Sequence, residues 1–291
     1  SFGTKDSTKL LPVDFSHLST HSYTAVFDET FFKTFRGTLR ISVIATAMCV
    51  LIGLPVAYFA AFKVPEKWKA IILAAGRGTR LAPLTDTTPK PLLPINGQPL
   101  IVRQLQQLRA ANITHVIINL YHLGDLIEHA LGNGEKFGMQ IAYSHELSLL
   151  ETGGGIKNAL PLLEEEEFIV CNGDIYTDFD FSSLPDALAP NDTAHLVLTP
   201  TPNTRARGDF EYSHGRVTQR GDDFVYCGIS IFSQRIFANS PEGAFSSRDL
   251  MFEAIDQGQL SARVHKGQWT DIGTLDDYHK VANRDSITST S

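Results

Sequence analysis

The segment KAIILAAGRGTRLAPLTDTTPKPLLP, residues 69–94, decides the fold of this chain. It starts with a short apolar run, KAIILA, that ends at a glycine turn, and such a run is typical of a fully buried parallel strand. A glycine-rich stretch follows at once. Because glycine has no Cβ, it lets backbone N–H groups come close to phosphate oxygens. The segment therefore predicts a buried strand that ends in a phosphate-binding loop.

Two common phosphate motifs do not fit this loop. A P-loop needs Gly-Lys-Ser or Gly-Lys-Thr after four spacer residues, and neither Gly76 nor Gly78 is followed by one. A dinucleotide fingerprint needs a third glycine where Leu81 stands. What remains is GxGTR followed by a lysine, so that Arg80 can fork onto phosphate oxygens and Lys90 can supply a point charge. A plain turn with surface cations would explain a bare GxG, but the full string is far more specific.

Helical and strand patterns alternate after the loop. Residues 99–111 and 123–131 read as helices, and residues 114–119 and 139–143 read as strands. This alternation predicts a parallel sheet with right-handed crossovers. In such sheets ligands bind at the carboxyl ends of the strands.

A further apolar strand, which starts at Phe168, ends in the sequence NGD and predicts that Asp174 emerges at the carboxyl edge of the sheet. A magnesium ion that keeps several waters needs only one or two protein carboxylates in addition to phosphate oxygens. Asp174 is therefore a candidate metal ligand. The alternative for a single aspartate after a strand is a turn or a helix cap.

The stretch LAAGRGTRLAPLTDTTPKPLLPINGQPLI resembles the signature of the sugar-1-phosphate nucleotidyltransferases, and the resemblance extends over about residues 69–284. It implies an α/β, Rossmann-like fold with a mostly parallel central sheet. It also implies catalytic roles for Arg80, Lys90 and Asp174, and a metal site formed by Asp174 and Asp271, the latter in the WTDIGT motif. The expected nucleotide-binding residues are Ala74, Ala75, Gly76, Gly78, Thr79, Arg80, Lys90, Gly153, Gly154 and Asn172, and the expected sugar-binding residues are Glu151, Gly208, Asp209 and Gly228.

The resemblance further implies transfer of a uridylyl group from UTP to a sugar-1-phosphate, with Mg²⁺ as cofactor. The expected acceptor is N-acetylmuramic acid α-1-phosphate, which places the reaction in peptidoglycan recycling in the cytoplasm. Glucose-1-phosphate or mannose-1-phosphate, with UTP or GTP, is the alternative acceptor. A protein that binds nucleotide sugars without catalysis is a further alternative, against which the intact Arg80, Lys90, Asp174 and Asp271 weigh.

The first 68 residues differ in character from the rest of the chain. The sequence ISVIATAMCVLIGLPVAYFAAF, residues 41–62, has no charged residue and is long enough to span a bilayer. With its flanks it resembles the first membrane span of polyamine-type ABC transporter permeases, although one span cannot transport anything. We therefore predict a permease-like segment over residues 1–68, not part of the enzyme, and a catalytic domain over 69–291. The alternatives are an inner-membrane tether and a buried helix of a soluble domain.

Charge and cysteine content exclude two other classes of protein. The net charge of -7 argues against a general nucleic-acid binder. The cysteines, Cys49, Cys171 and Cys227, show no CxxC spacing and suggest neither a zinc site nor a disulfide framework. Cys171 and Cys227 are expected to be small core residues.

Overall fold

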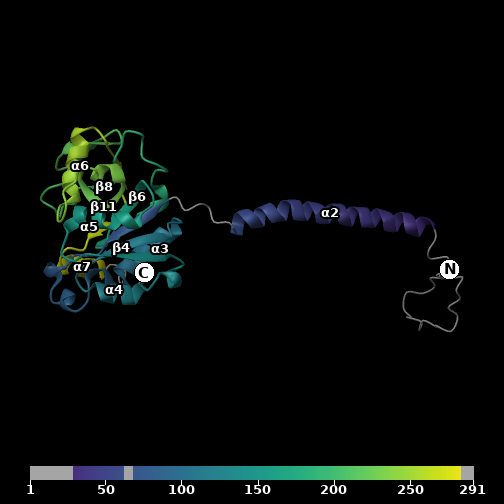
Figure 1. Ribbon diagram of the computed structural model, residues 1–291, viewed down its shortest axis with the longest axis horizontal. Helices are drawn as coiled ribbons and strands as arrows, with labels where there is room; N and C mark the ends of the chain where they lie inside the picture. Colours follow the sequence, from purple (N-terminus) through teal and green to yellow (C-terminus); the bar gives the residue numbers. More distant parts are fainter. Residues whose placement is uncertain (1–28, 62–67, 283–291) are drawn as a thin grey trace. The chain divides into compact units, whose positions relative to one another are not determined.

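The computed structural model describes residues 29–61 and 68–282, and the chain divides into two compact units, Ser1–Pro65 and Glu66–Ser291 (Figure 1). In the first unit the described residues form one long helix, α2 (Glu29–Ala61). The predicted apolar helix over residues 41–62 is confirmed as far as Ala61, and it begins earlier than predicted, at Glu29. The most apolar 18-residue stretch within Glu29–Leu54 has a mean hydropathy of 1.9 and is 0% buried. By length and composition this helix is apolar enough to cross a membrane.

The second unit alternates strands and helices, as predicted. Its helices are α3 (Leu100–Ala110), α4 (Gly124–Leu131), α5 (Glu151–Ala159), α6 (Ser247–Asp256) and α7 (Leu275–Ala282). Its strands are β1 (Lys69–Leu73), β2 (Pro94–Ile95), β3 (Gln98–Pro99), β4 (His115–Leu120), β5 (Gln140–His145), β6 (Glu167–Asn172), β7 (Ile175–Thr177), β8 (Ala194–Pro200), β9 (Phe210–Ser213), β10 (Arg216–Arg220), β11 (Phe224–Ser233), β12 (Leu260–Val264) and β13 (Trp269–Asp271).

Nine of these strands form one twisted sheet in the order β5-β4-β1-β6-β11-β8-β12-β10-β9. The strands β5, β4, β1 and β6 are parallel neighbours, and β12 is parallel to β8. Strand β11 is antiparallel to β6 and β8, and β10 is antiparallel to β12 and β9. Only β10 and β11 of this sheet therefore run against the other strands, which confirms a mostly parallel α/β fold.

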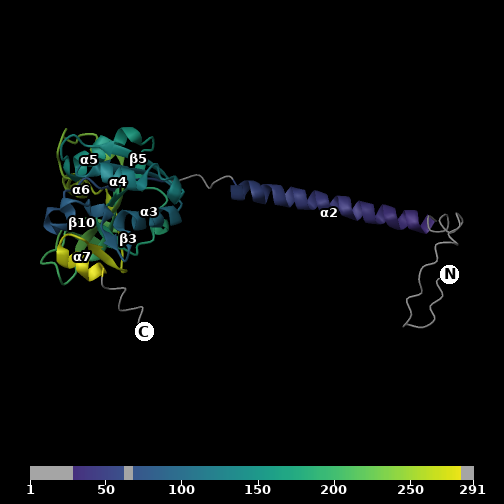
Figure 2. The same ribbon diagram turned by 90° about the horizontal axis from the view of Figure 1, so that it is seen from below.

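Helices cover both faces of the sheet (Figures 1 and 2). On one face α3 and α4 pack against the side chains of alternate strand residues such as Ile72 and Ile118. On the other face α5 and α6 pack against the intervening residues, for example Ile71 and Ile117. This alternation is the pleat of a strand buried on both sides. Trp68, just before the predicted catalytic domain, is 8% exposed and belongs to the first of these cores.

A small two-stranded sheet brings two distant parts of the chain together. Strand β13 pairs antiparallel with β7, so that Asp271 lies opposite Ile175 and Trp269 lies opposite Thr177. Asp174, directly before β7, accepts a hydrogen bond from the N–H of Ile272 through its backbone carbonyl (3.0 Å). The pairing thereby fixes the two aspartates that the sequence marks as metal ligands beside each other.

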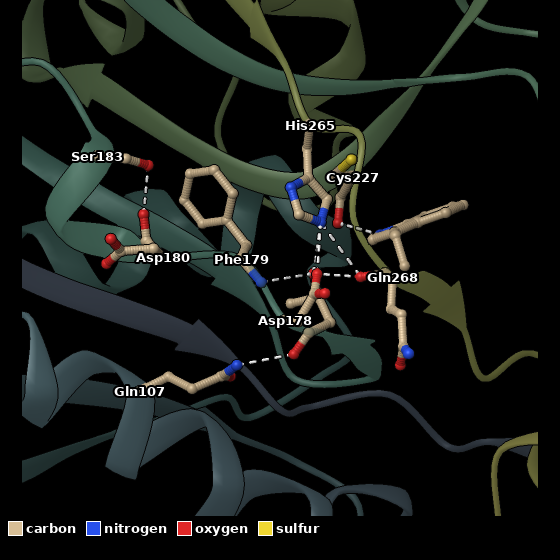
Figure 3. Close-up of polar contacts among 10 residues, drawn as sticks. Gln107, Asp178, Phe179, Asp180, Ser183, Cys227, His265 and Gln268 are labelled. Carbon is tan, nitrogen blue, oxygen red and sulfur yellow. Dashed lines mark hydrogen bonds and ion pairs between the residues drawn. The ribbon is translucent and has the colours of Figure 1, made fainter. Parts of the chain in front are cut away.

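Polar contacts hold the loop before β13 on the end of β7 (Figure 3). The buried hydroxyl of Thr177 donates to the carbonyl of Gln268 (2.8 Å) and accepts from the N–H of Phe179 (3.1 Å). Nε2 of His265 lies 3.0 Å from Oδ1 of Asp178 and 3.2 Å from the Gln268 carbonyl, so this nitrogen carries the proton. These contacts set the position at which β13 begins.

We expect Thr177→Val to destabilise the second unit, because it keeps the side-chain shape and removes both hydroxyl hydrogen bonds from a buried site. The expected loss of unfolding free energy is about 1–3 kcal/mol, measured by urea denaturation. Thr177→Ser is the matched control, since it keeps the hydroxyl, and it should retain most of the stability. Equal losses in the two variants would contradict this role of the hydroxyl.

Candidate functional site

The carboxyl ends of three parallel strands meet at one edge of the large sheet. Leu73 of β1 is in register with Asn119 of β4 and Asn172 of β6. A pocket opens at this edge, called the first pocket here, between the glycine-rich loop, the start of α5 and the segment after β6. It is lined by Leu73, Ala74, Ala75, Gly76, Lys90, Pro91, Asn119, Leu149, Glu151, Thr152, Asn172, Gly173 and Asp174.

One part of the glycine-rich loop lines the first pocket, and another part forms a turn of the chain. The stretch Ala74 to Gly76 lines the first pocket, and a Cβ on Gly76 would meet no atom within 4 Å, so the space beside it is open. Gly78 does not line the pocket. It adopts a φ of 63° before the short helix η2 (Thr79–Leu81), and a Cβ on it would lie 2.9 Å from Cγ2 of Thr85. The turn therefore needs glycine at this position.

Arg80 lies outside the lining of the first pocket. Its side chain reaches the segment after β13, where a Cβ on Gly273 would be 3.3 Å from Nη2 of Arg80. Its positive charge is one of the influences that lower the pKa of Asp271. The predicted catalytic arginine thus approaches the site from the side of the second carboxylate.

Lys90 and Asp174 form a close ion pair. The short helix η4 (Lys90–Leu92) begins after Pro89, and it holds Lys90 with only 9% of its surface exposed. The Lys90 Nζ donates to Oδ2 of Asp174 at 2.6 Å. Both residues line the first pocket, so two of the predicted catalytic groups meet directly.

Asp271 lies near this pair in an unfavourable electrostatic environment. Burial raises its pKa, and the negative charge of Asp174 raises it further, while the charges of Lys90, Arg205 and Arg80 oppose the shift. Two neighbouring carboxylates thus face one buried lysine. Such a pair suits a divalent cation that completes its coordination with water and phosphate oxygens, as the sequence suggests for Mg²⁺. The oxygen ligands and negative charge of the two carboxylates are what make this place suitable for such a cation.

The three glycines of α5 allow close packing in the structure. The N–H groups of Gly153 and Gly154 donate to the carbonyl of Phe245 (2.8 and 3.2 Å). A Cβ on Gly153 would lie 2.3 Å from the Phe245 ring, and one on Gly154 would lie 2.2 Å from the carbonyl oxygen of Gly243. Their predicted contact with nucleotide stays a prediction, whereas their neighbours Glu151 and Thr152 do line the first pocket.

A second pocket adjoins the first and shares Asn172 with it. Its lining residues are Asn172, Ile175, Arg205, Asp209, Tyr226, Cys227, Gly228, Arg248, Trp269 and Asp271. Gly228 has a φ of 77°, and a Cβ there would be 2.8 Å from Nδ2 of Asn172. Glycine at this position therefore leaves room for the side chain shared by the two pockets.

The predicted sugar-binding residues are divided between the two pockets. Asp209 and Gly228 line the second pocket. Gly208 lies next in sequence to Asp209, and a Cβ on it would be 2.6 Å from the backbone of Asp222. Glu151 lines the first pocket instead of the second, because it begins α5 at the edge of the large sheet.

Sequence reasoning missed several polar residues of the site. Asn119 accepts from the N–H of Ala74 (2.6 Å) and donates to Glu146 (2.6 Å), whose other oxygen accepts from the N–H of Leu150 (2.9 Å). Burial raises the pKa of Glu146. Polar residues at the ends of β4 and β5 were the available signal, since both strands end at the ligand-binding edge. Arg205 and Arg248 carried no comparable signal, whereas Trp269 opens the WTDIGT motif that was used only for its aspartate.

The catalytic unit is similar in sequence to proteins of one known family. The family model described as nucleotidyl transferase matches residues 69–287. The chain is 41% identical over 220 residues to the N-acetylmuramate alpha-1-phosphate uridylyltransferase of Neisseria meningitidis serogroup B, covering 71% of this chain and 94% of that protein. It is 33% identical to the protein of the same name from Caulobacter vibrioides, covering 70% and 91%.

A solved structure agrees with this result. HddC from Yersinia pseudotuberculosis, complexed with GMP-PN, superposes with a TM-score of 0.62 at 27% sequence identity. The alignment covers 75% of this chain and 99% of that one. The chain is an enzyme that belongs to the nucleotidyl transferase family.

Proposed function

We propose that the chain transfers a uridylyl group from UTP to a sugar-1-phosphate, with N-acetylmuramic acid α-1-phosphate as the preferred acceptor. The observation that carries the proposal is the placement of the carboxylates: Asp174 lines the first pocket, Asp271 lines the second, and Asn172 lines both. A nucleotide in the first pocket and a sugar phosphate in the second would meet beside this pair.

The reaction is an in-line displacement at phosphorus. A phosphate oxygen of the sugar-1-phosphate attacks the α-phosphorus of UTP, the bond from that phosphorus to the bridging oxygen breaks, and pyrophosphate leaves with the electron pair. A phosphate monoester is a competent nucleophile at neutral pH, so no side chain needs to remove a proton. Catalysis then consists of positioning the two phosphates and neutralising their charge.

The residues of the site divide this work. Backbone groups of Ala74 to Gly76 border the triphosphate, and Lys90 lies where it can exchange its partner Asp174 for a phosphate oxygen. Arg80 approaches from the side of Asp271 and holds the leaving pyrophosphate. Asp174 and Asp271 would hold Mg²⁺, which supplies charge neutralisation between nucleotide and sugar phosphate when bound.

The acceptor is inferred from the relatives. The two proteins from Neisseria meningitidis and Caulobacter vibrioides carry N-acetylmuramate α-1-phosphate in their names, and this chain spans more than nine-tenths of each. Formation of UDP-N-acetylmuramic acid by this chain would serve peptidoglycan recycling in the cytoplasm, with residues 1–68 outside the catalytic domain.

Pyrophosphate release tests the reaction and the acceptor together. We expect the full chain with Mg²⁺ to release pyrophosphate from UTP and N-acetylmuramic acid α-1-phosphate with a higher kcat/KM than from UTP with glucose-1-phosphate or GTP with mannose-1-phosphate. A higher kcat/KM with another pair of nucleotide and sugar phosphate would show that the proposed acceptor is wrong. Release with none of them would support the alternative of a non-catalytic nucleotide-sugar-binding protein.

Replacing the second carboxylate tests the catalytic assignment. We expect Asp271→Asn to lower kcat by about 10²–10³ while the melting temperature stays the same or rises, because the change removes a charge that burial and Asp174 disfavour. Asp276→Asn is the matched control. It removes the same charge from an exposed residue of α7 and should leave kcat unchanged. A kcat for Asp271→Asn equal to that of the control would exclude Asp271 from catalysis.

A further inference from the structure

Two arginines converge on one carboxylate in the second pocket. Nη2 of Arg248 lies 3.3 Å from Oδ1 of Asp209, and Nη1 of Arg205 lies 3.8 Å from Oδ2. The N–H of Tyr226 donates to the same Oδ2 (3.1 Å) and thereby fixes the carboxylate. The side chain of Asp209 is 12% exposed, whereas those of Arg205 and Arg248 are 40% and 55% exposed. The anion is thus mostly covered, and the two cations keep open surface.

The charges around Asp209 do not balance. Two guanidinium groups contact this single carboxylate, and the charge of Arg205 also acts on Asp271, so Arg248 is the cation that shares its only carboxylate partner in the described part of the pocket. Asp271 lines the pocket as well, but it lies beside Asp174 and Lys90 and belongs to the proposed metal site. A guanidinium offers several N–H donors in one plane, so each arginine can hold Asp209 and a further anion at once.

The position of Arg248 separates it from the site of phosphate transfer. Arg248 lines the second pocket together with Asp271, and it also lines an adjoining hollow with Ser246, Ser247 and Met251. This hollow shares Thr152 and Asn172 with the first pocket, but its lining does not include Asp174, Asp271 or Lys90. Arg205 lies 6.0 Å from the centre of the Trp269 ring, which donates through Nε1 to the carbonyl of Cys227 (2.8 Å). With the 1-phosphate held at Asp271, on the side of the metal site, the other substituents of the sugar ring are the groups left to meet Arg248.

We propose that Arg205 and Arg248 form a subsite for a carboxylate carried on the sugar ring, with Arg248 as its main contact. This inference rests on the proposed function and deepens it. It assigns the preference for an acid-bearing sugar-1-phosphate to two residues. N-acetylmuramic acid α-1-phosphate fits, because it is N-acetylglucosamine α-1-phosphate with a lactyl ether that ends in a carboxylate. The subsite selects between these two acceptors by that group alone.

The test compares the two acceptors in the full chain and in Arg248→Met. In the unmodified chain, we expect N-acetylmuramic acid α-1-phosphate to have the higher kcat/KM with UTP. Arg248→Met should lower that value about 10-fold or more, as expected for loss of a charge-assisted hydrogen bond, and should change the value for N-acetylglucosamine α-1-phosphate less than about twofold. Arg207→Met, at an exposed position of the same loop as Arg205, is the matched control and should change neither value.

Three results would overturn the subsite. Equal losses of kcat/KM for the two acceptors in Arg248→Met would show that Arg248 holds the shared 1-phosphate. An unchanged preference in this variant would show that Arg248 contacts no carboxylate of the sugar. Equal kcat/KM values for the two acceptors in the unmodified chain would show that no such subsite exists. Arg205→Met provides a second variant if Arg248→Met lowers the melting temperature. Calorimetric binding of the same two sugar phosphates gives the preference without turnover, so failure of the proposed reaction and failure of the subsite are distinguishable.

Discussion

The placement of two like charges beside each other is the constraint on which this site depends. Asp174 and Asp271 are far apart in sequence, and the charge of Asp174 disfavours the ionised form of Asp271. The pairing of β7 with β13 holds them together, and the backbone bond from Ile272 to Asp174 fixes their register. Backbone pairing, which does not depend on charge, therefore holds the repulsive pair in place together with the nearby cation Lys90. Such a pair is well prepared to bind a cation.

Much of this arrangement could be predicted from the sequence. A strand that is buried on both faces can be predicted from its continuous apolar composition. Its carboxyl end then indicates the ligand-binding edge of the sheet. The strand before Asp174 and the glycine-rich loop after Leu73 were therefore predicted at the correct edge of the sheet, and the helix at residues 99–111 was predicted almost to its ends. Lys90 was expected to bind phosphate, and its buried contact with Asp174 agrees with a place in the same cleft.

The remainder depends on contacts between parts of the chain that show no mutual pattern. Arg205 and Arg248 come from an irregular loop and from the first turn of α6, and only the folded chain brings them to Asp209. The glycines of α5, in contrast, form a pattern that is visible in the sequence but has more than one explanation. Their sequence pattern predicts contact with a ligand, and in the structure Gly153 also approaches the Phe245 ring too closely for any side chain. A glycine needed for close packing looks the same in sequence as one needed for binding.

That close packing has a mechanical consequence. Gly153 and Gly154 bond to the carbonyl of Phe245, and the Thr152 hydroxyl accepts from the N–H of Ser247 (3.0 Å), so the start of α5 is joined to the segment that leads into Arg248. Thr152 touches the pocket assigned to the nucleotide, and Arg248 touches the one assigned to the sugar. A displacement of one wall would therefore strain the hydrogen bonds that hold the other wall in place. Occupation of one pocket is in this way felt at the wall of the other through these bonds.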